Sequence, residues 1–247
     1  MAALATATRG WAGGRDRLRR RPTAGRWITG QRATIGGRRF DVYLPAGRRR
    51  AALPVVVLLH GCNQSGAEFA DATRFTTVAD RNRVLLVVPS QERHHHPRRC
   101  WRWYSDAHQH RDGGEPAALV AITRAVLAER RRWRADPRRV YVAGLSAGGA
   151  MALVLAVAYP DVFAAVGLHS APAYRAATHS GQVFAAMAGR TGVPAPLAGA
   201  PAIPPTVVVQ GGGDRVVRPL NGRTVVDQWL AHRDASGGVG RSRTDTT

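Results

Sequence analysis

The segment whose residue types point most directly to chemistry is Gly144-Leu145-Ser146-Ala147-Gly148. It follows the predicted strand Arg139–Gly144 and opens a helical pattern over Ala147–Ala158. A serine between glycines at a strand-to-helix turn is typical of a nucleophile elbow, because the serine takes a strained positive φ that bulkier neighbours would block. We therefore interpret Ser146 as the nucleophile of an acyl transfer. An ordinary glycine-rich turn is the alternative.

Acyl transfer also needs hydrogen-bond donors aimed at the oxyanion that develops in the transition state. One expected donor is the backbone N–H of Ala147, the residue after the nucleophile. The second should come from a loop after an earlier strand, and His60-Gly61-Cys62 follows the apolar run Val55–Leu59. We predict that the N–H of Cys62 is this donor. His60 could act as a base, but we favour a role in orienting the loop through hydrogen bonds.

A carboxylate that could serve as a triad acid follows a later strand pattern. Asp214 comes after the glycine turn Gly211–Gly213, and that turn follows the run Thr206–Val209. In this chain order the acid is expected after a strand beyond the nucleophile. The alternative for Asp214 is a turn aspartate that accepts hydrogen bonds from local backbone N–H groups. Asp161, at a helix–strand junction, is interpreted as such a turn residue.

Buried strands and helices alternate along the chain, and together they must position these residues. The expected strands are Val55–His60, Val84–Pro89, Arg139–Gly144, Val162–Leu168 and Thr206–Val209. The expected helices are Gly66–Asn82, Glu115–Trp133, Ala147–Ala158 and Asn221–Arg233. A hairpin over Ala33–Ile35 and Phe40–Leu44 should precede them, and residues 171–205 should form an insert over one end of the sheet. The alternation predicts an α/β fold, with a mostly parallel sheet covered by helices on both faces.

Further motifs are spread in register over about residues 33–232. They include His60-Gly61-Cys62-x-Gln64-Ser65, Cys100-Trp101-x-Trp103, Gly113-x-Glu115-Pro116, the elbow followed by Gly149-Ala150-Met151, and Asp214-x-x-Val217. With these motifs the chain resembles the polyhydroxybutyrate depolymerase family of esterases, whose relatives include feruloyl and acetylxylan esterases. The resemblance implies an α/β-hydrolase fold and cofactor-free serine esterase activity on hydroxyalkanoate or similar carboxylic esters, in polymers or oligomers. It also implies Ser146 as nucleophile, Asp214 as triad acid, and Cys62 with Ala147 as oxyanion donors.

The resemblance extends to cysteines and aromatic residues near the expected site. Cys62 and Cys100 match the family's two cysteine positions, which implies a disulfide and an extracellular location; free thiols in a cytoplasmic protein are the alternative. We expect Trp101, Trp103 and Tyr104 to line the ester-binding cleft, because aromatic faces suit an apolar acyl chain. For Trp101, a buried cluster that anchors the loop is the alternative.

The triad histidine is where the chain departs from the family's pattern. The resemblance places it beyond Asp214, after another strand, in a Gly-x-x-His-x-Trp-like loop that this sequence does not contain. The one histidine after Asp214 is His232, which we interpret as a solvated histidine at a helix end. We hypothesise that the C-terminus is truncated or frameshifted and the last strand missing. A catalytically impaired ester-binding homologue is the alternative, since losing a triad member leaves only about 10³–10⁴-fold catalysis.

Composition separates the expected domain from its ends. All 36 basic residues are arginine, against 16 acidic residues, and the arginines are dense in residues 1–31, a stretch without the apolar core of a signal peptide. We predict a disordered basic arm at 1–31, the esterase domain at 32–233 and a polar tail at 234–247. Because every basic residue is arginine, we attribute the high positive charge to a GC-rich coding sequence; nucleic-acid binders usually mix lysine and arginine and cluster them on one face. We therefore expect no nucleic-acid partner, and binding through the arm is the least favoured alternative.

Two further classes of function are not expected. The sequence holds no run of 18 apolar residues, so a membrane-spanning helix is not predicted. His94-His95-His96 lies beside arginines, with no carboxylate or cysteine recognised at ligand spacing, and we predict no metal site there.

Overall fold

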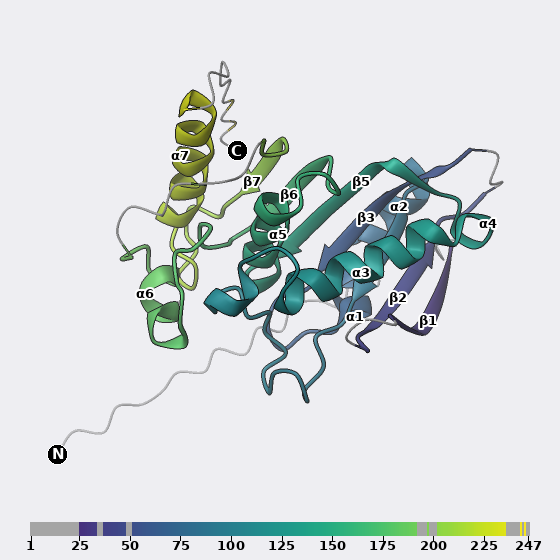
Figure 1. Cartoon of the computed structure of the whole chain (residues 1–247), viewed down its shortest axis with the longest axis horizontal. Helices are drawn as coiled ribbons and strands as arrows, with labels where there is room; N and C mark the ends of the chain where they lie inside the picture. Colours follow the sequence, from purple (N-terminus) through teal and green to yellow (C-terminus); the bar gives the residue numbers. More distant parts are fainter. Residues whose placement is uncertain are drawn as a thin grey trace, which may run out of the picture.

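The computed structural model describes residues 25–33, 37–47, 51–191, 197, 202–235, 243 and 245 (Figure 1). These residues form a seven-stranded sheet with the order β1-β2-β4-β3-β5-β6-β7. Strands β1 and β2 form an antiparallel hairpin, β2 pairs antiparallel with β4, and the remaining neighbours are parallel. The strands are β1 (Arg26–Arg32), β2 (Arg39–Leu44), β3 (Leu53–Leu59), β4 (Leu85–Pro89), β5 (Ala135–Leu145), β6 (Ala165–His169) and β7 (Thr206–Val209).

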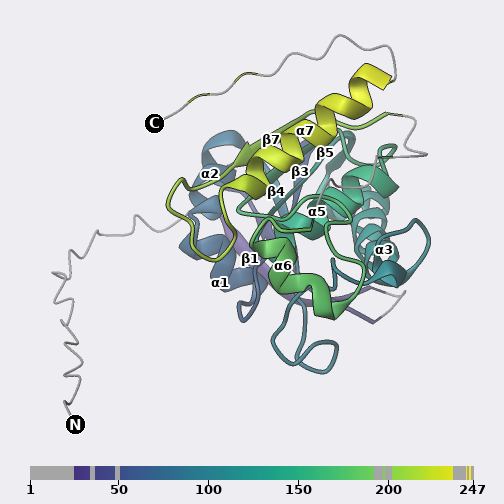
Figure 2. The same ribbon diagram turned by 90° about the vertical axis from the view of Figure 1, so that its left-hand side faces the viewer.

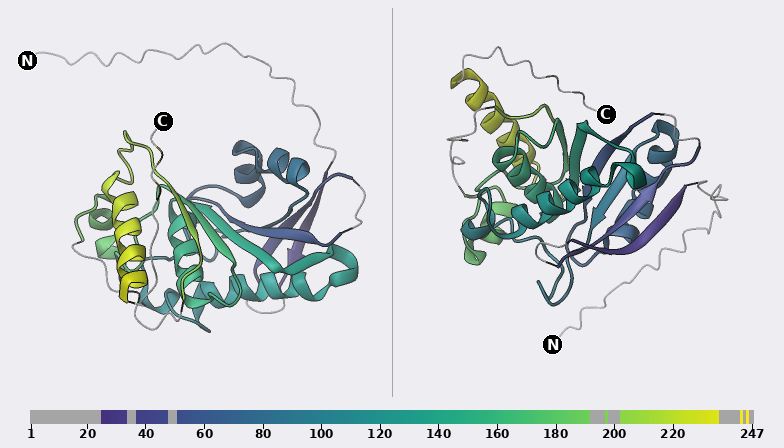
Figure 3. Two further views of the ribbon diagram at one scale, coloured as in Figure 1. Left: turned by 90° about the horizontal axis from the view of Figure 1, so that it is seen from above. Right: turned by 45° about the vertical axis from the view of Figure 1, so that its right-hand side comes forward.

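Helices cover both faces of this sheet. Helices α3 and α5 pack on one face and α1 and α2 on the other, while α6 and α7 lie at the β6–β7 end (Figures 1, 2 and 3). The helices are α1 (Gly66–Ala72), α2 (Phe75–Asn82), α3 (Gly114–Ala128), α4 (Arg130–Trp133), α5 (Ala147–Ala158), α6 (Val183–Met187) and α7 (Leu220–Ala235), with 3-10 turns η1 (Asp106–His108) and η2 (Ser180–Gln182). The predicted α/β fold, with its mostly parallel sheet and N-terminal hairpin, is confirmed.

The hairpin begins earlier than the sequence pattern suggests. Strand β1 starts at Arg26, inside the segment expected to be a disordered arm, and Trp27 pairs with Tyr43 across the strands with their rings 5.2 Å apart. Such cross-strand aromatic pairs stabilise a hairpin. The expected boundary at residue 31 is therefore wrong. Residues 1–24, residues 34–36 of the expected first strand and most of 236–247 lie outside the described residues.

The expected helix over Gly66–Asn82 is two helices. Ser65 caps α1 through a reciprocal capping box with Glu68. The chain then turns at Arg74, which has a φ of 59°, and the Thr73 hydroxyl donates to the Phe69 carbonyl at 2.6 Å. A left-handed residue ends a helix because the backbone can no longer continue its hydrogen-bond ladder. Among the described residues, no helix is both long and apolar enough to cross a bilayer.

The register of the parallel strands brings their carboxyl ends to one edge of the sheet. Leu59 pairs with Gly144, Gly144 with Leu168, and Leu168 with Val208. The loops that follow β3, β5, β6 and β7 therefore start side by side. In open α/β sheets, ligands bind at this edge, outside the carboxyl ends of the strands.

Candidate active site

Ser146 occupies a sharp turn between β5 and α5. Its backbone has φ 54° and ψ −119°, and its N–H donates to the His169 carbonyl at 2.9 Å. A Cβ atom on Gly144 would lie 2.3 Å from the Gly148 carbonyl oxygen, and one on Gly148 would lie 2.2 Å from the Leu59 carbonyl oxygen. Larger residues cannot fit at either position without displacing backbone. The turn has the geometry expected of a nucleophile elbow, with Ser146 half-buried at the sheet edge.

The loop after β3 lies directly beside this turn. The Gly61 N–H is held by the Gln64 side chain at 2.8 Å, and a Cβ on Gly61 would lie 3.5 Å from the Leu145 carbonyl oxygen. The next residue, Cys62, forms a disulfide with Cys100. On the other side of the site, Ala147 is the first residue of α5, where backbone N–H groups have no acceptor within the helix. Both expected oxyanion donors therefore belong to backbone that flanks Ser146.

His60 is fully buried beneath the loop. Its Nε2 accepts from the Gln91 N–H at 3.0 Å, and its Nδ1 lies 2.7 Å from the Gly61 carbonyl. These partners assign the neutral tautomer that donates from Nδ1. Burial lowers the pKa of His60, which favours the neutral ring further. With both ring nitrogens engaged, His60 orients the loop.

A buried polar cluster under the loop has no counterpart among the sequence-based expectations. It joins Arg38, Gln91 and Glu115, all nearly inaccessible to solvent. Arg38 Nη2 pairs with Glu115 Oε1 at 3.2 Å, and Arg38 Nη1 also donates to the Gln91 side chain. Gln91 Nε2 donates to the Cys100 carbonyl at 2.9 Å, and Glu115 Oε2 accepts from the Arg102 N–H at 2.7 Å. The cluster fixes the segment that carries Cys100.

The three aromatic residues of this segment differ in accessibility. Trp101 is fully buried and its Nε1 donates to the His60 carbonyl at 3.0 Å, which is the anchoring role left open by the sequence. Trp103 is 5% exposed. Tyr104 is half-buried, with its hydroxyl 3.2 Å from His96 Nε2 and its ring edge-on to Trp103. Of the three, Tyr104 offers the most surface to a ligand.

Asp214 lies in the turn after β7. Its Oδ1 accepts from the N–H groups of Val216 and Val217, both at 2.9 Å, and its Oδ2 faces Gln210 Nε2 at 3.4 Å. Burial would raise the pKa of Asp214, but hydrogen bonds from the Ser170 hydroxyl and the two amides outweigh it and hold the pKa below its usual value. Asp214 is therefore an ionised carboxylate, and it also makes the local bonds of a turn aspartate.

Ser170 connects the nucleophile to the acid, a link that the sequence did not indicate. It follows His169, whose carbonyl accepts from the Ser146 N–H, and it is buried with a φ of 49°. The Ser170 N–H donates to the Val209 carbonyl at 2.9 Å, and its hydroxyl helps to lower the pKa of Asp214. A positive φ at a non-glycine residue is uncommon and often marks a functional position.

His232 lies away from this cluster along α7. The start of α7 packs near Asp214, because a Cβ on Gly222 would lie 2.9 Å from the Cβ of Gln210. His232 is ten residues further along the helix, which corresponds to about 15 Å of axis. It is half-buried, in the last turns of the helix.

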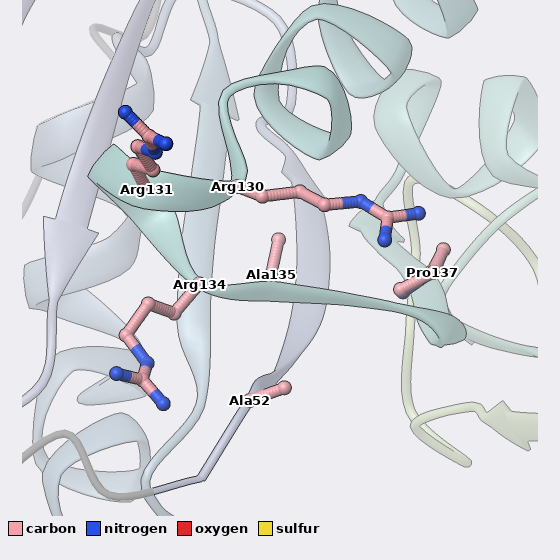
Figure 4. A pocket seen from close by; sticks show the side chains of 6 residues that line it. All are labelled: Ala52, Arg130, Arg131, Arg134, Ala135 and Pro137. Atoms are coloured by element: carbon pink, nitrogen blue, oxygen red, sulfur yellow. The ribbon is translucent and has the colours of Figure 1, made fainter.

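A hollow lies at the end of β5 opposite Ser146. Figure 4 shows its lining residues Ala52, Arg130, Arg131, Arg134, Ala135 and Pro137. The three guanidinium groups point in different directions and do not converge on one point (Figure 4). Because Ala135 begins β5 and Leu145 ends it, this hollow is separated from Ser146 by the length of the strand.

Known proteins share both the sequence pattern and the fold of this chain. The sequence model of a family described as Esterase PHB depolymerase matches residues 38–247. Poly(3-hydroxyalkanoate) depolymerase C of Paucimonas lemoignei is 30% identical over 203 residues, covering 76% of this chain and 46% of that protein. Feruloyl esterase B of Thermothelomyces thermophilus is 34% identical over 122 residues, covering 49% of this chain and 40% of that protein. The chain thus spans less than half the length of these curated relatives.

A solved structure with low sequence identity to this chain shares its fold. The acetyl xylan esterase from Aspergillus awamori superposes with a TM-score of 0.69 at 20% identity, covering 85% of this chain and 80% of that chain. At this level of identity the likeness establishes the shared architecture.

Proposed function

We propose that this chain, which belongs to the Esterase PHB depolymerase family, hydrolyses carboxylic esters through an acyl intermediate on Ser146. The observation that carries the proposal is the strained backbone of Ser146, φ 54° and ψ −119°, in a turn that only glycine neighbours permit. Backbone strain of this kind persists where the surrounding structure enforces it. Here it presents a hydroxyl at the edge where the strands end.

The proposed reaction has two steps. The Ser146 hydroxyl transfers its proton to a general base, which later gives it to the leaving alcohol, and the Ser146 oxygen attacks the ester carbonyl carbon, which turns the carbonyl oxygen into an oxyanion. The N–H groups of Ala147 and Cys62 stabilise this charge, and the alcohol leaves with a proton as the acyl-serine forms. Water then attacks the acyl group, which releases the carboxylic acid and restores Ser146.

Asp214 is the proposed triad acid, supported by its ionised state and by its link through Ser170 to the strand beside Ser146. We assign no residue to the general base. The one histidine that follows Asp214, His232, lies about 15 Å along the axis of α7 from Gly222, the residue of this helix that contacts Gln210. Removing a triad member in a serine hydrolase leaves about 10³–10⁴-fold catalysis from the oxyanion donors and binding. A turnover rate well above this residual level would therefore show that a residue of the chain acts as the general base.

The proposed substrates are hydroxyalkanoate esters or related carboxylic esters, as polymers or oligomers. The names of the relatives support this choice. So does the aromatic surface of Tyr104, on the segment that the Cys62–Cys100 disulfide joins to the loop at residues 60–65, here called the oxyanion loop. The Cys62–Cys100 disulfide supports an extracellular location, because disulfides persist in oxidising compartments.

The test is turnover of p-nitrophenyl butyrate and of 3-hydroxybutyrate oligomers by the chain and by Ser146→Ala. We expect Ser146→Ala to keep only the residual catalysis, about 10³–10⁴-fold over water, that the oxyanion donors and binding supply, with Ser180→Ala, an exposed serine in η2, as the matched control. Equal rates for the chain and Ser146→Ala would overturn the proposal.

A further inference from the structure

The turn after β4 gathers three side chains of metal-ligand type. Glu92, His94 and His95 each offer one ligand atom, and these atoms all lie within 4.8 Å of one another. No metal site is expected here from the sequence, on the ground that no carboxylate stands at ligand spacing from the histidines. That ground is wrong, because the N–H of His95 donates to the Glu92 carbonyl at 3.0 Å and folds the chain back on itself.

Two of the candidate ligand atoms are buried and unpaired. Glu92 Oε2 and His95 Nε2 are both shielded from solvent, and neither has a hydrogen-bond partner within the described part of the chain. Glu92 Oε2 forms an ion pair with His94, but the distance to His94 Nε2 is 4.0 Å, which is too long for a hydrogen bond. Buried polar atoms in proteins are nearly always satisfied, so each exception calls for an explanation such as an ion.

The neighbouring histidine is already engaged, which limits the set to three residues. His96 Nδ1 accepts from the N–H groups of Arg98 and Cys100, both at 3.2 Å, and its Nε2 lies 3.2 Å from the Tyr104 hydroxyl. These bonds hold the turn, and Arg102 adds another by donating to the His95 carbonyl at 2.7 Å. The backbone that carries the three candidate ligands is therefore fixed on both sides.

Two imidazoles and one carboxylate determine which ion would bind. Zn²⁺ takes this donor set, whereas Ca²⁺ and Mg²⁺ prefer several oxygen ligands. A tetrahedral ion with bonds near 2.1 Å holds its ligand atoms about 3.4 Å apart, so the side chains must close by about 1 Å. His94 can make this movement, because its side chain is 63% exposed.

The surrounding charges oppose a cation and limit the affinity. Arg39 Nη1 lies 3.9 Å from Glu92 Oε1, the carboxylate oxygen that is not the candidate ligand, and the Arg93 side chain donates to the Pro97 carbonyl. An ion held by neutral imidazole nitrogens and one carboxylate oxygen adds positive charge to this region. Such a site needs strong metal–nitrogen bonds, which again favours late transition metals over Ca²⁺ or Mg²⁺.

We propose that Glu92, His94 and His95 form a binding site for one Zn²⁺-class divalent ion. The site is separate from the proposed nucleophile and acid. It lies between Gln91, whose N–H holds His60, and Cys100, whose disulfide holds Cys62, so a bound ion stiffens the segment that supports the oxyanion loop. An ion that binds the folded chain better than the unfolded chain raises its thermal stability.

The test is titration of the untagged full chain with ZnCl₂ by isothermal calorimetry at pH 7.5. We expect one Zn²⁺ per chain, and affinity at least tenfold weaker in Glu92→Gln, in His95→Ala and in His94→Ala. His94→Ala keeps the comparison sound if a buried ligand proves necessary for folding, because His94 is exposed. The matched control is His110→Ala, which removes an exposed histidine 3.3 Å from Asp106 and should leave the affinity unchanged.

Two further readouts separate this site from loose binding by surface histidines. Zn²⁺ should raise the melting temperature of the chain and of His110→Ala, and should do so less in the three ligand variants. Co²⁺ should give visible absorption bands that disappear in the same variants. Absence of Zn²⁺ binding, or equal affinity in the chain and all three ligand variants, would overturn the proposal.

Discussion

Ser146 and Asp214 both follow parallel strands at one edge of the sheet, but their surroundings differ. Gly148, beside the nucleophile, has no room for a Cβ atom, and the oxyanion loop rests on the buried His60 and Trp101. Around the acid, Gly211–Gly213 is exposed, and Val216 is 66% exposed. The nucleophile is thus positioned by the core of the molecule, and the acid by hydrogen bonds within its own turn and to Ser170.

The largest expected effect comes from the polar cluster under the oxyanion loop. Replacing Glu115 with Ala leaves the charged, buried Arg38 without its carboxylate partner, which should lower the free energy of unfolding by about 3–5 kcal/mol. Urea denaturation measures this change. The control is Asp161→Ala, whose partner Arg111 is exposed, where about 0–1 kcal/mol is expected. Equal losses of unfolding free energy in Glu115→Ala and Asp161→Ala would contradict the expected difference between a buried and an exposed ion pair.

A glycine pair tests the same comparison within the site. In Gly148→Ala the new methyl group meets the Leu59 carbonyl, and we expect a loss of about 1–3 kcal/mol in the free energy of unfolding. Gly212 lies in the turn before Asp214, and a Cβ added there would meet no atom within 4 Å. Gly212→Ala should therefore stay within about 0.5 kcal/mol of the parent. Thermal melts of both variants measure the difference, and similar melting temperatures would show that the elbow is not tightly constrained.

The smallest expected effects are differences in pH dependence. The pKa of His60 is lowered by burial, so the unfolded chain binds this proton first as the pH falls. Stability should therefore be lost as the pH falls from about 6.5 through the folded-state pKa, and His60→Gln should remove that loss. The slope of unfolding free energy against pH measures it. A slope unchanged by the substitution would show that His60 is not held neutral.

Asp214 should act in a lower pH window. Its folded-state pKa is also lowered, by Ser170 and the amides of Val216 and Val217 against the effect of burial. The stability it contributes is present above the unfolded-state pKa of about 3.9 and is lost as the pH falls through the folded-state value. Asp214→Asn should therefore differ from the parent at pH 7 and converge with it below that window. A constant difference at all pH values would mean that the charge of Asp214 makes no contribution.

Local patterns made the elbow and the fold predictable. A strand, glycines around a serine and a helix are contiguous in the sequence, so Ser146 could be placed without tertiary information. The side-chain hydrogen bonds of Glu115 join residues from 13 to 77 positions away, and no local pattern reports them. For the same reason Glu115 could be recognised as part of a motif but not as the partner of Arg38.

Backbone turns account for the other differences. Arg74 breaks the expected helix with a positive φ at a position that holds neither glycine nor proline. Ser170 likewise takes a positive φ that its residue type does not announce, and so its contact with Asp214 was not foreseen. The turn that brings Glu92 back to His95 depends on backbone hydrogen bonds rather than on a residue signature.

The central claim is that Ser146 is a reactive nucleophile beside preformed oxyanion donors. Treatment of the folded chain with a fluorophosphonate, followed by peptide mass spectrometry, tests it most directly, with Ser180 and Ser170 as internal comparison serines. We predict one phosphonate adduct per chain, on Ser146, and none in Ser146→Ala. An unlabelled folded chain, or an adduct distributed over other serines, would contradict the account.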